Sequence, residues 1–206
     1  MILPDVFTAS TVSLSKTESV QRSVSRGGVI QLGRRTAHET EVKITSPLIK
    51  QKDVGALIAF LDDVGTSTPF DVELPLISKL KGSATANMRT RAAATAGSKT
   101  LLIDGAQANL MNIVKPNDMF NVSGHSKAYF VGVNMTGNQV NAFNSNGTGQ
   151  FTLRSSQPLI KNVANNETVN FLTPKITVVR TSDVDLVISV KRSNFVTVSF
   201  DAVEFV

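Results

Sequence analysis

The chain contains no cysteine and no tryptophan, and among its 206 residues there are one tyrosine, Tyr129, and two histidines. Without cysteine it cannot form disulfides, use a thiolate nucleophile or build zinc sites that need sulfur ligands. No run approaches about 18 consecutive apolar residues, and the N-terminus lacks the basic-then-apolar order of a signal peptide. We therefore expect synthesis in the cytoplasm, no membrane insertion, and stability that comes from packing or assembly.

The composition that remains favours strands. Val, Thr, Ser and Asn are abundant, aromatic residues make up 6% of the chain, and 41% of it is apolar, which suffices for a buried core. The net charge of +5 is unevenly distributed. Residues 83–174 carry seven Lys or Arg against three Asp or Glu, whereas the flanking parts carry fourteen against thirteen. The sequence thus divides into a basic middle and near-neutral ends.

Alternating apolar residues predict strands at both ends of the chain. Residues 29–35 and 39–45 read as a hairpin whose tip carries Arg34, Arg35 and His38. We interpret that tip as a solvated turn, with a phosphate or partner contact as the alternative. Residues 69–82 continue with one more strand, and residues 175–206 read as three strands without a helix. These strands need one another as partners, which predicts one domain built from residues 1–82 plus 175–206.

One helix is predicted, over about residues 47–64. Ser46 and Pro47 offer an N-cap followed by proline at the first helical position. Gly65 stands where a C-terminal cap is needed, and Asp62 and Asp63 read as a solvated acidic end, with cation binding as the alternative. Five apolar residues at helical spacing form a stripe that we expect to lie on a sheet: Val54, Leu57, Ile58, Leu61 and Val64.

The middle of the chain predicts a small barrel. Residues 83–99 are small, polar and basic, and candidate strands cover residues 88–92, 100–103, 119–122, 128–133 and 151–154, with 139–143 as a further possibility. Asn, Gly and Asp separate these runs as turn residues do. That spacing suits a closed barrel at residues 83–174, inserted into the outer domain.

His125 is the residue on which an enzymatic interpretation depends, because it lies beside Ser126 and follows Asp118 by seven residues. A catalytic triad needs a carboxylate that orients the histidine and a nucleophile within its reach. Here a strand carries the chain roughly 15 Å away from Asp118 before His125 is reached. We interpret His125 as a residue of the turn between two strands.

The sequence also lacks the other motifs that carry chemistry. It has no phosphate-binding glycine loop, and its two histidines are far apart. We therefore predict no catalytic residues, no metal and no cofactor. The basic barrel is a possible binding module, but single-strand binders pair a basic groove with exposed aromatic rings. Most of the barrel's few rings occupy positions that a barrel core would claim, so we favour a solvated surface.

The order of these pieces resembles the distal tail proteins of long non-contractile-tailed bacteriophages, over nearly the whole chain. The resemblance rests on the start MILPD, the segments AFLDDVG and FDVELP, a basic linker, and a motif in the middle module. That motif runs from Asn117-Asp118-Met119-Phe120 to Lys127-Ala128-Tyr129-Phe130-Val131. Asn117 replaces an expected glycine, and the turn survives because Asn tolerates left-handed backbone.

The resemblance implies a mainly β fold: a β-sandwich with one helix, similar to tail-tube proteins and interrupted by an inserted OB-fold barrel. It also implies a hexameric ring in the virion, at the tail tip, around a lumen through which DNA passes. The implied partners are further copies, the tail tube protein and the baseplate hub protein, with tail fibre, collar or tape-measure proteins as further candidates. The residues of its OB-fold motif are Asp118, Phe120, Lys127, Tyr129 and Val131.

Two functional hypotheses follow. In the first, the chain is a structural ring adaptor whose sheet edges are covered by neighbouring copies. The best candidates for subunit contacts are then residues of the outer strands: Val29, Gln31, Val42, Ile44, Val196, Val198 and Phe200. In the second, the barrel is a carbohydrate- or oligonucleotide-binding module for host attachment. Burial of Tyr129 and Phe143 would remove the stacking surface that this alternative requires.

Overall fold

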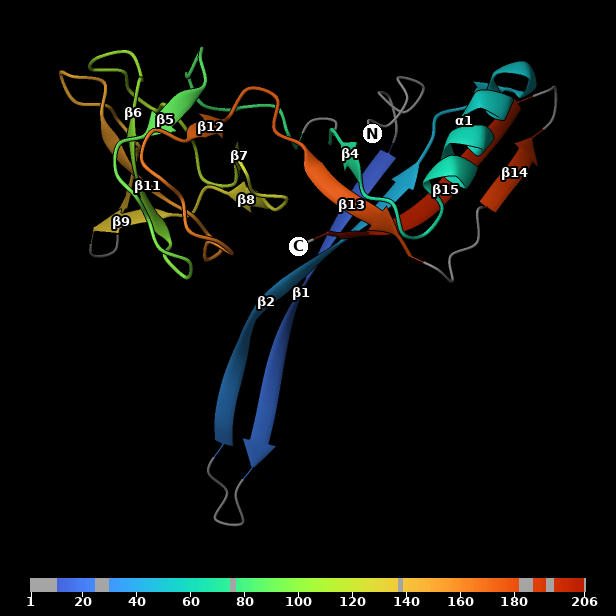
Figure 1. Ribbon diagram of the computed structural model, residues 1–206, viewed down its shortest axis with the longest axis horizontal. Helices are drawn as coiled ribbons and strands as arrows, with labels where there is room; N and C mark the ends of the chain where they lie inside the picture. The colour runs from blue at the N-terminus through green and yellow to red at the C-terminus, as the bar shows by residue number, and fades with distance from the viewer. Residues whose placement is uncertain are drawn as a thin grey trace.

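The computed structural model describes residues 11–24, 30–74, 77–136, 139–181, 187–191 and 195–205, with the backbone alone over 16–24, 30–39, 135–136, 139–141 and 187–191. Within these ranges the chain is mainly β, with fifteen strands and one helix (Figure 1). The strands form two larger antiparallel sheets and a small hairpin of β9 and β10. The mainly β class predicted from the sequence is therefore confirmed.

The first sheet joins the beginning of the chain to its end. It has the order β1-β2-β15-β13-β4, and β3 and β14 also pair with β15. The alternation predicted for the last strand is present, because every second side chain of β15 is buried. The strands are β1 (Thr11–Val24), β2 (Ile30–Thr45), β3 (Ile49–Lys50), β4 (Phe70–Val72), β13 (Ile176–Arg180), β14 (Val187–Lys191) and β15 (Phe195–Glu204).

Helix α1 (Gln51–Val64) covers one face of this sheet (Figure 1). The predicted stripe is largely correct, because Val54, Leu57, Leu61 and Val64 are buried and Ile58 is half-buried. At the C-terminal end, Gly65 has a φ of 56° and donates its N–H to the Leu61 carbonyl at 3.1 Å.

The predicted start of the helix is wrong. Ile49 and Lys50 are paired with β15 as β3, so α1 begins only at Gln51. The Ser46 hydroxyl, which was expected to cap the helix, instead accepts the Val198 N–H at 2.9 Å. The Ser46 hydroxyl, which the local sequence assigned to the helix, is therefore used in a contact with a strand that is distant in sequence.

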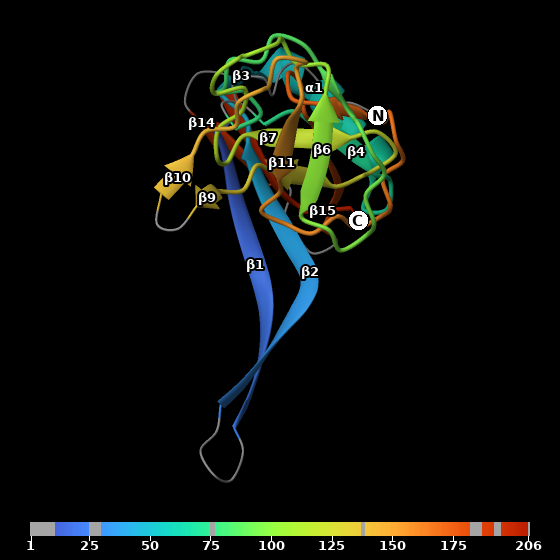
Figure 2. The same cartoon turned by 90° about the vertical axis from the view of Figure 1, so that its left-hand side faces the viewer.

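The first two strands extend beyond the sheet as a long ribbon, which Figures 1 and 2 show reaching away from both sheets. β2 pairs with β15 only from Glu41 to Thr45, whereas its pairing with β1 runs on to Ile30. The predicted hairpin tip at Arg34–His38 is wrong, because this segment lies within β2. The register shifts there, between the Glu18–His38 pair and the Val20–Arg34 pair.

The second sheet is built from the middle of the chain and has the order β11-β6-β5-β12-β7-β8. It curls until its two ends meet, where Val131 bridges Ser155. Sequence patterns missed β12 and β9, which are three residues long. The strands are β5 (Met88–Thr90), β6 (Thr100–Asp104), β7 (Met119–Val122), β8 (Ala128–Phe130), β9 (Asn134–Thr136), β10 (Gln139–Asn141), β11 (Phe151–Arg154) and β12 (Thr168–Asn170).

Each sheet has its own hydrophobic cluster, one with Phe70, Leu61 and Phe200 and the other with Phe120 and Phe171. The OB-fold identity of the middle part and the domain boundaries at residues 83 and 174 stay predictions. The curl of the second sheet is compatible with them.

The two sheets meet at a junction that contains both apolar side-chain contacts and hydrogen bonds. Met119, Ala128 and Phe130 of the second sheet pack into the cluster of the first. The Asn121 side chain donates to the Lys175 carbonyl at 2.7 Å and accepts the Lys175 N–H at 2.6 Å. These contacts fix the middle part against the strand that returns to the first sheet.

Candidate functional site

His125 lies in the connection between β7 and β8, where the sequence predicted a turn. Its Nδ1 is 2.7 Å from the Tyr129 hydroxyl, and its Nε2 is 3.5 Å from the Asn162 carbonyl. The Tyr129 oxygen accepts the Ile160 N–H at 3.1 Å, which leaves the hydroxyl proton for Nδ1. Because the Asn162 carbonyl can only accept, this contact favours the His125 tautomer with its proton on Nε2. His125 and Tyr129 together connect the β7–β8 segment to residues 160–162.

Burial governs the protonation of this pair. Burial lowers the pKa of His125 below its ordinary value of 6.5, and the hydrogen bond with the Asn162 carbonyl opposes that shift. Burial also raises the pKa of Tyr129 above its ordinary value of 10.0. Both groups are thus held neutral near pH 7, as expected for a structural hydrogen bond.

Asp118, the carboxylate that the sequence offered as a partner for His125, has different contacts. It is fully buried and accepts the Lys115 N–H at 2.7 Å and the Lys81 N–H at 3.1 Å. The preceding Asn117 has a φ of 66°, the left-handed conformation predicted for it. Asp118 therefore anchors the start of β7 and the entering linker, and it does not orient the histidine.

The other residues of the predicted OB-fold motif lie in the core. The Phe120 and Tyr129 rings are stacked with centroids 5.6 Å apart, and Val131 is buried beside them in the same cluster. Lys127 is buried too, and its Nζ is 3.7 Å from Oε2 of Glu204. Local sequence patterns did not reveal this partner, because Glu204 lies at the far end of the chain in β15.

Aromatic rings are buried throughout the middle part. Tyr129 and Phe143 are 0% and 2% exposed, and the remaining rings of residues 83–174 are buried as well. Stacking on nucleobases or sugar faces needs an exposed ring. The surface required by the second hypothesis is therefore missing from the described residues of the middle part.

The predicted subunit contacts are core residues where the structure describes them. Val42, Ile44, Val196, Val198 and Phe200 are all buried within one chain. Val29 lies outside the described residues, and of Gln31 the backbone alone is described, in β2. A second copy that approached these strands would instead contact the alternate side chains that face outward.

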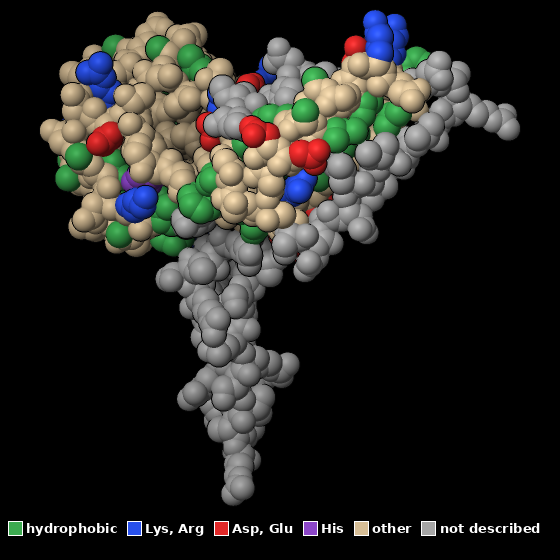
Figure 3. All heavy atoms as spheres, turned by 45° about the vertical axis from the view of Figure 1, so that its right-hand side comes forward, with side chains coloured by type: hydrophobic (Ala, Val, Ile, Leu, Met, Phe, Trp, Pro, Cys, Tyr) green, Lys and Arg blue, Asp and Glu red, His purple; other side chains and the backbone are tan. Residues whose placement is uncertain are grey.

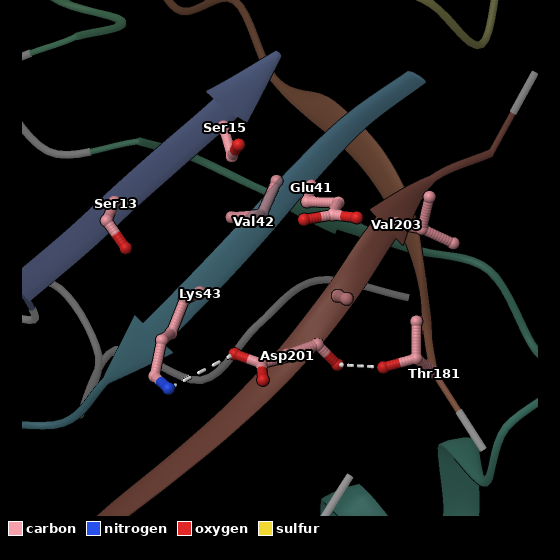
Figure 4. A pocket seen from close by; sticks show the side chains of 9 residues that line it. Ser13, Ser15, Glu41, Val42, Lys43, Thr181, Asp201 and Val203 are labelled. Carbon is pink, nitrogen blue, oxygen red and sulfur yellow. Dashed lines mark hydrogen bonds and ion pairs between the residues drawn. The ribbon is translucent and has the colours of Figure 1, made fainter. Parts of the chain in front are cut away.

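Those outward side chains surround a hollow of about 420 Å³ at the base of the ribbon. Figure 4 shows Ser13 and Ser15 on β1, Glu41 and Lys43 on β2, and Asp201 on β15. The Lys43 ammonium is 3.8 Å from the Asp201 carboxylate, and both side chains are partly exposed. Such an ion pair contributes little to stability in water, but it leaves a polar, nearly neutral face available for contact.

Metal-ligating side chains do not gather anywhere in the described residues, and Asp62 and Asp63 are exposed at the end of α1. The helix of the described chain is too short to cross a bilayer. Comparison with known protein families found no match, and a search of curated proteins found none either.

Proposed function

We propose that the chain is a structural subunit of a bacteriophage tail, a ring adaptor of six copies that joins the tail tube to the baseplate hub around the DNA conduit. The observation that carries this proposal is the ribbon of β1 and β2. The family, the number six and the virion partners come from the sequence resemblance. The ribbon supplies an independent reason for assembly.

The ribbon has strand edges whose backbone N–H and C=O groups are not paired with another described strand of the same chain. Among the described strands, β1 pairs only with β2, and β2 pairs only with β1 from Ile30 to Thr40. A two-stranded hairpin is marginally stable in water, and a long open edge invites pairing with another chain. A closed ring supplies a partner to each copy and leaves no free end.

The proposed partners follow from this arrangement. Further copies pair laterally through the first sheet, and the tail tube and baseplate hub proteins contact the two faces of the ring. Tail fibre, collar or tape-measure proteins are additional candidates, DNA passes through without specific contacts, and no membrane insertion is involved. The mechanism is assembly, without catalysis or a cofactor. The stacking form of the carbohydrate or oligonucleotide alternative is not favoured, because its aromatic surface is buried.

Ribbon shortening tests the proposal. Glu18 and His38 are directly paired, so an Asn-Gly turn between them can replace residues 19–37. We expect the full chain to form a ring in light scattering and electron microscopy, alone or when mixed with the tail tube protein. The shortened chain should stay monomeric while keeping its circular dichroism spectrum. Assembly of the shortened chain into the same particle, or a full chain that never assembles, would refute the proposal.

A further inference from the structure

Two neighbouring hollows lie on the second sheet and share the side chain of Arg154, the last residue of β11. The first hollow, of about 390 Å³, is lined by Lys99, Asn117 and Ser155 as well as Arg154. Its size falls within the range of small-molecule sites. Two cations therefore line one concave surface.

The second hollow, of about 280 Å³, continues on the other side of Arg154. Its polar side chains include Asn134, Asn144 and Thr152, and its apolar part includes the buried ring of Phe143. We call the two hollows together the Arg154 groove. The groove places a cation between two cavities that are lined with amides and hydroxyls.

The sheet backbone fixes the positions of the two cations. Arg154 pairs with Thr100 across the β11–β6 ladder, and both side chains are exposed. The residue that follows β11, Ser155, donates its N–H to the carbonyl of Lys99 at 2.7 Å. Both cations thus project from one end of the same strand pair, which is a rigid support for a binding site.

The charge of the Arg154 groove is uncompensated. Among the described residues no Asp or Glu lines either hollow, and neither Lys99 nor Arg154 forms an ion pair there. The hollow on the first sheet is different, because Asp201 pairs with Lys43 there. On the face of the molecule that Figure 3 shows, the visible acidic side chains also lie mostly over the first sheet. The Arg154 groove therefore suits an anionic ligand.

We propose that the Arg154 groove binds a hydroxyl-rich polyanion, a glycan or polyol chain that carries phosphate or carboxylate groups. The anionic group lies between Lys99 and Arg154, where an arginine fork can hold two of its oxygens. The neighbouring polyol units lie in the two hollows and bond to amide and hydroxyl groups such as those of Asn117 and Thr152. Nucleic acid fits less well, because every Phe and Tyr ring of the middle part, residues 83–174, is buried and none can stack on a base there.

Calorimetric titration of the full chain with poly(glycerol phosphate) and with polygalacturonate tests this proposal. We expect saturable binding of at least one of them. The variant Lys99→Gln/Arg154→Gln should weaken that binding about tenfold or more, because charge-assisted hydrogen bonds are lost. The control Lys52→Gln/Lys79→Gln removes the same charge at exposed sites near the first sheet and should bind as the parent does.

Several results would overturn the proposal. The first is that neither polymer binds. The second is that both double variants weaken binding equally, because this would indicate attraction to net charge alone. Equal affinity for oligothymidylate or polyglutamate would show that the hydroxyl-rich units contribute nothing. Neutral dextran provides the baseline, and its binding should be weaker than that of either polyanion. Because the groove does not depend on ring formation, these outcomes are independent of the ribbon experiment.

Discussion

Replacing Lys127 with methionine should destabilise the protein strongly, because this lysine is buried beside a buried carboxylate. The Lys127 and Glu204 side chains are 4% and 1% exposed, and the ammonium and carboxylate are 3.7 Å apart. Oε2 of Glu204 accepts no hydrogen bond in the described structure, so the lysine charge is its main compensation there. Removal of one partner of a buried pair leaves an uncompensated charge, which costs about 3–5 kcal/mol.

That loss corresponds to a decrease in Tm of roughly 6–20 °C for a chain of this size. Glu204→Gln should also lower the stability, because it removes the carboxylate that faces the buried Lys127 ammonium. The glutamine oxygen can still accept the Ala128 N–H that Oε1 now accepts at 3.0 Å. The double variant Lys127→Met/Glu204→Gln removes both charges. It should recover to within about 1–2 kcal/mol of the parent, because a buried pair and its neutral replacement are often nearly equal in stability.

Urea unfolding followed by circular dichroism measures these free energies for both sheets together. The fluorescence of Tyr129, the single tyrosine, reports separately on the second cluster. If the pair couples the sheets, both probes should shift together in each single variant. Additive losses in the double variant, or a loss below about 1 kcal/mol for Lys127→Met, would refute the reasoning.

Two further predictions concern the second sheet. Because burial lowers the pKa of His125 below 6.5, the unfolded chain binds more protons in mild acid. The Tm should therefore be nearly constant between about pH 7 and pH 9 and fall from about pH 6.5 downward. His125→Gln should remove this dependence, whereas His38→Gln should retain it, and an unchanged slope in His125→Gln would contradict the assignment. Gly149→Ala should lower the free energy of unfolding by about 3 kcal/mol or more, since its φ is 74° and a Cβ there would lie 2.0 Å from the Ala106 carbonyl oxygen. The control is Gly97→Ala, where φ is 84° and no atom lies within 4 Å of the added Cβ. It should lose only about 1–2 kcal/mol in the same urea titration. Equal losses in the two variants would exclude the steric explanation.

Features encoded by neighbouring residues could be predicted from the sequence. The buried stripe of α1, the alternation of β15 and the left-handed turn at Asn117 each depend on a periodicity or on one residue's backbone preference. The mainly β class follows from the same local signals. These parts were correct because tertiary contacts reinforce them.

Features that depend on distant partners could not be read from the sequence. Ser46 bonds to Val198 instead of capping the helix, and Lys127 is neutralised by Glu204. The polar segment around Arg34 was expected to turn, yet its pairing with β1 keeps it within a strand. The Arg154 groove also escaped prediction, since loops remote in sequence form its walls. In each case a contact of long sequence separation decides between local alternatives.

The ribbon and the Arg154 groove belong to different sheets, and the Lys127–Glu204 pair lies between them. The buried contacts at this junction therefore determine where the groove points relative to the strands proposed to form the ring. If six copies assemble, six identical grooves are held at fixed spacing around one axis, and a long polyanion could occupy several of them at once. Binding of a second groove is then intramolecular, so a weak single site becomes a strong attachment without any new contact. A shallow groove with two cations is suited to such repeated binding, whereas a single copy would hold the same polymer only briefly.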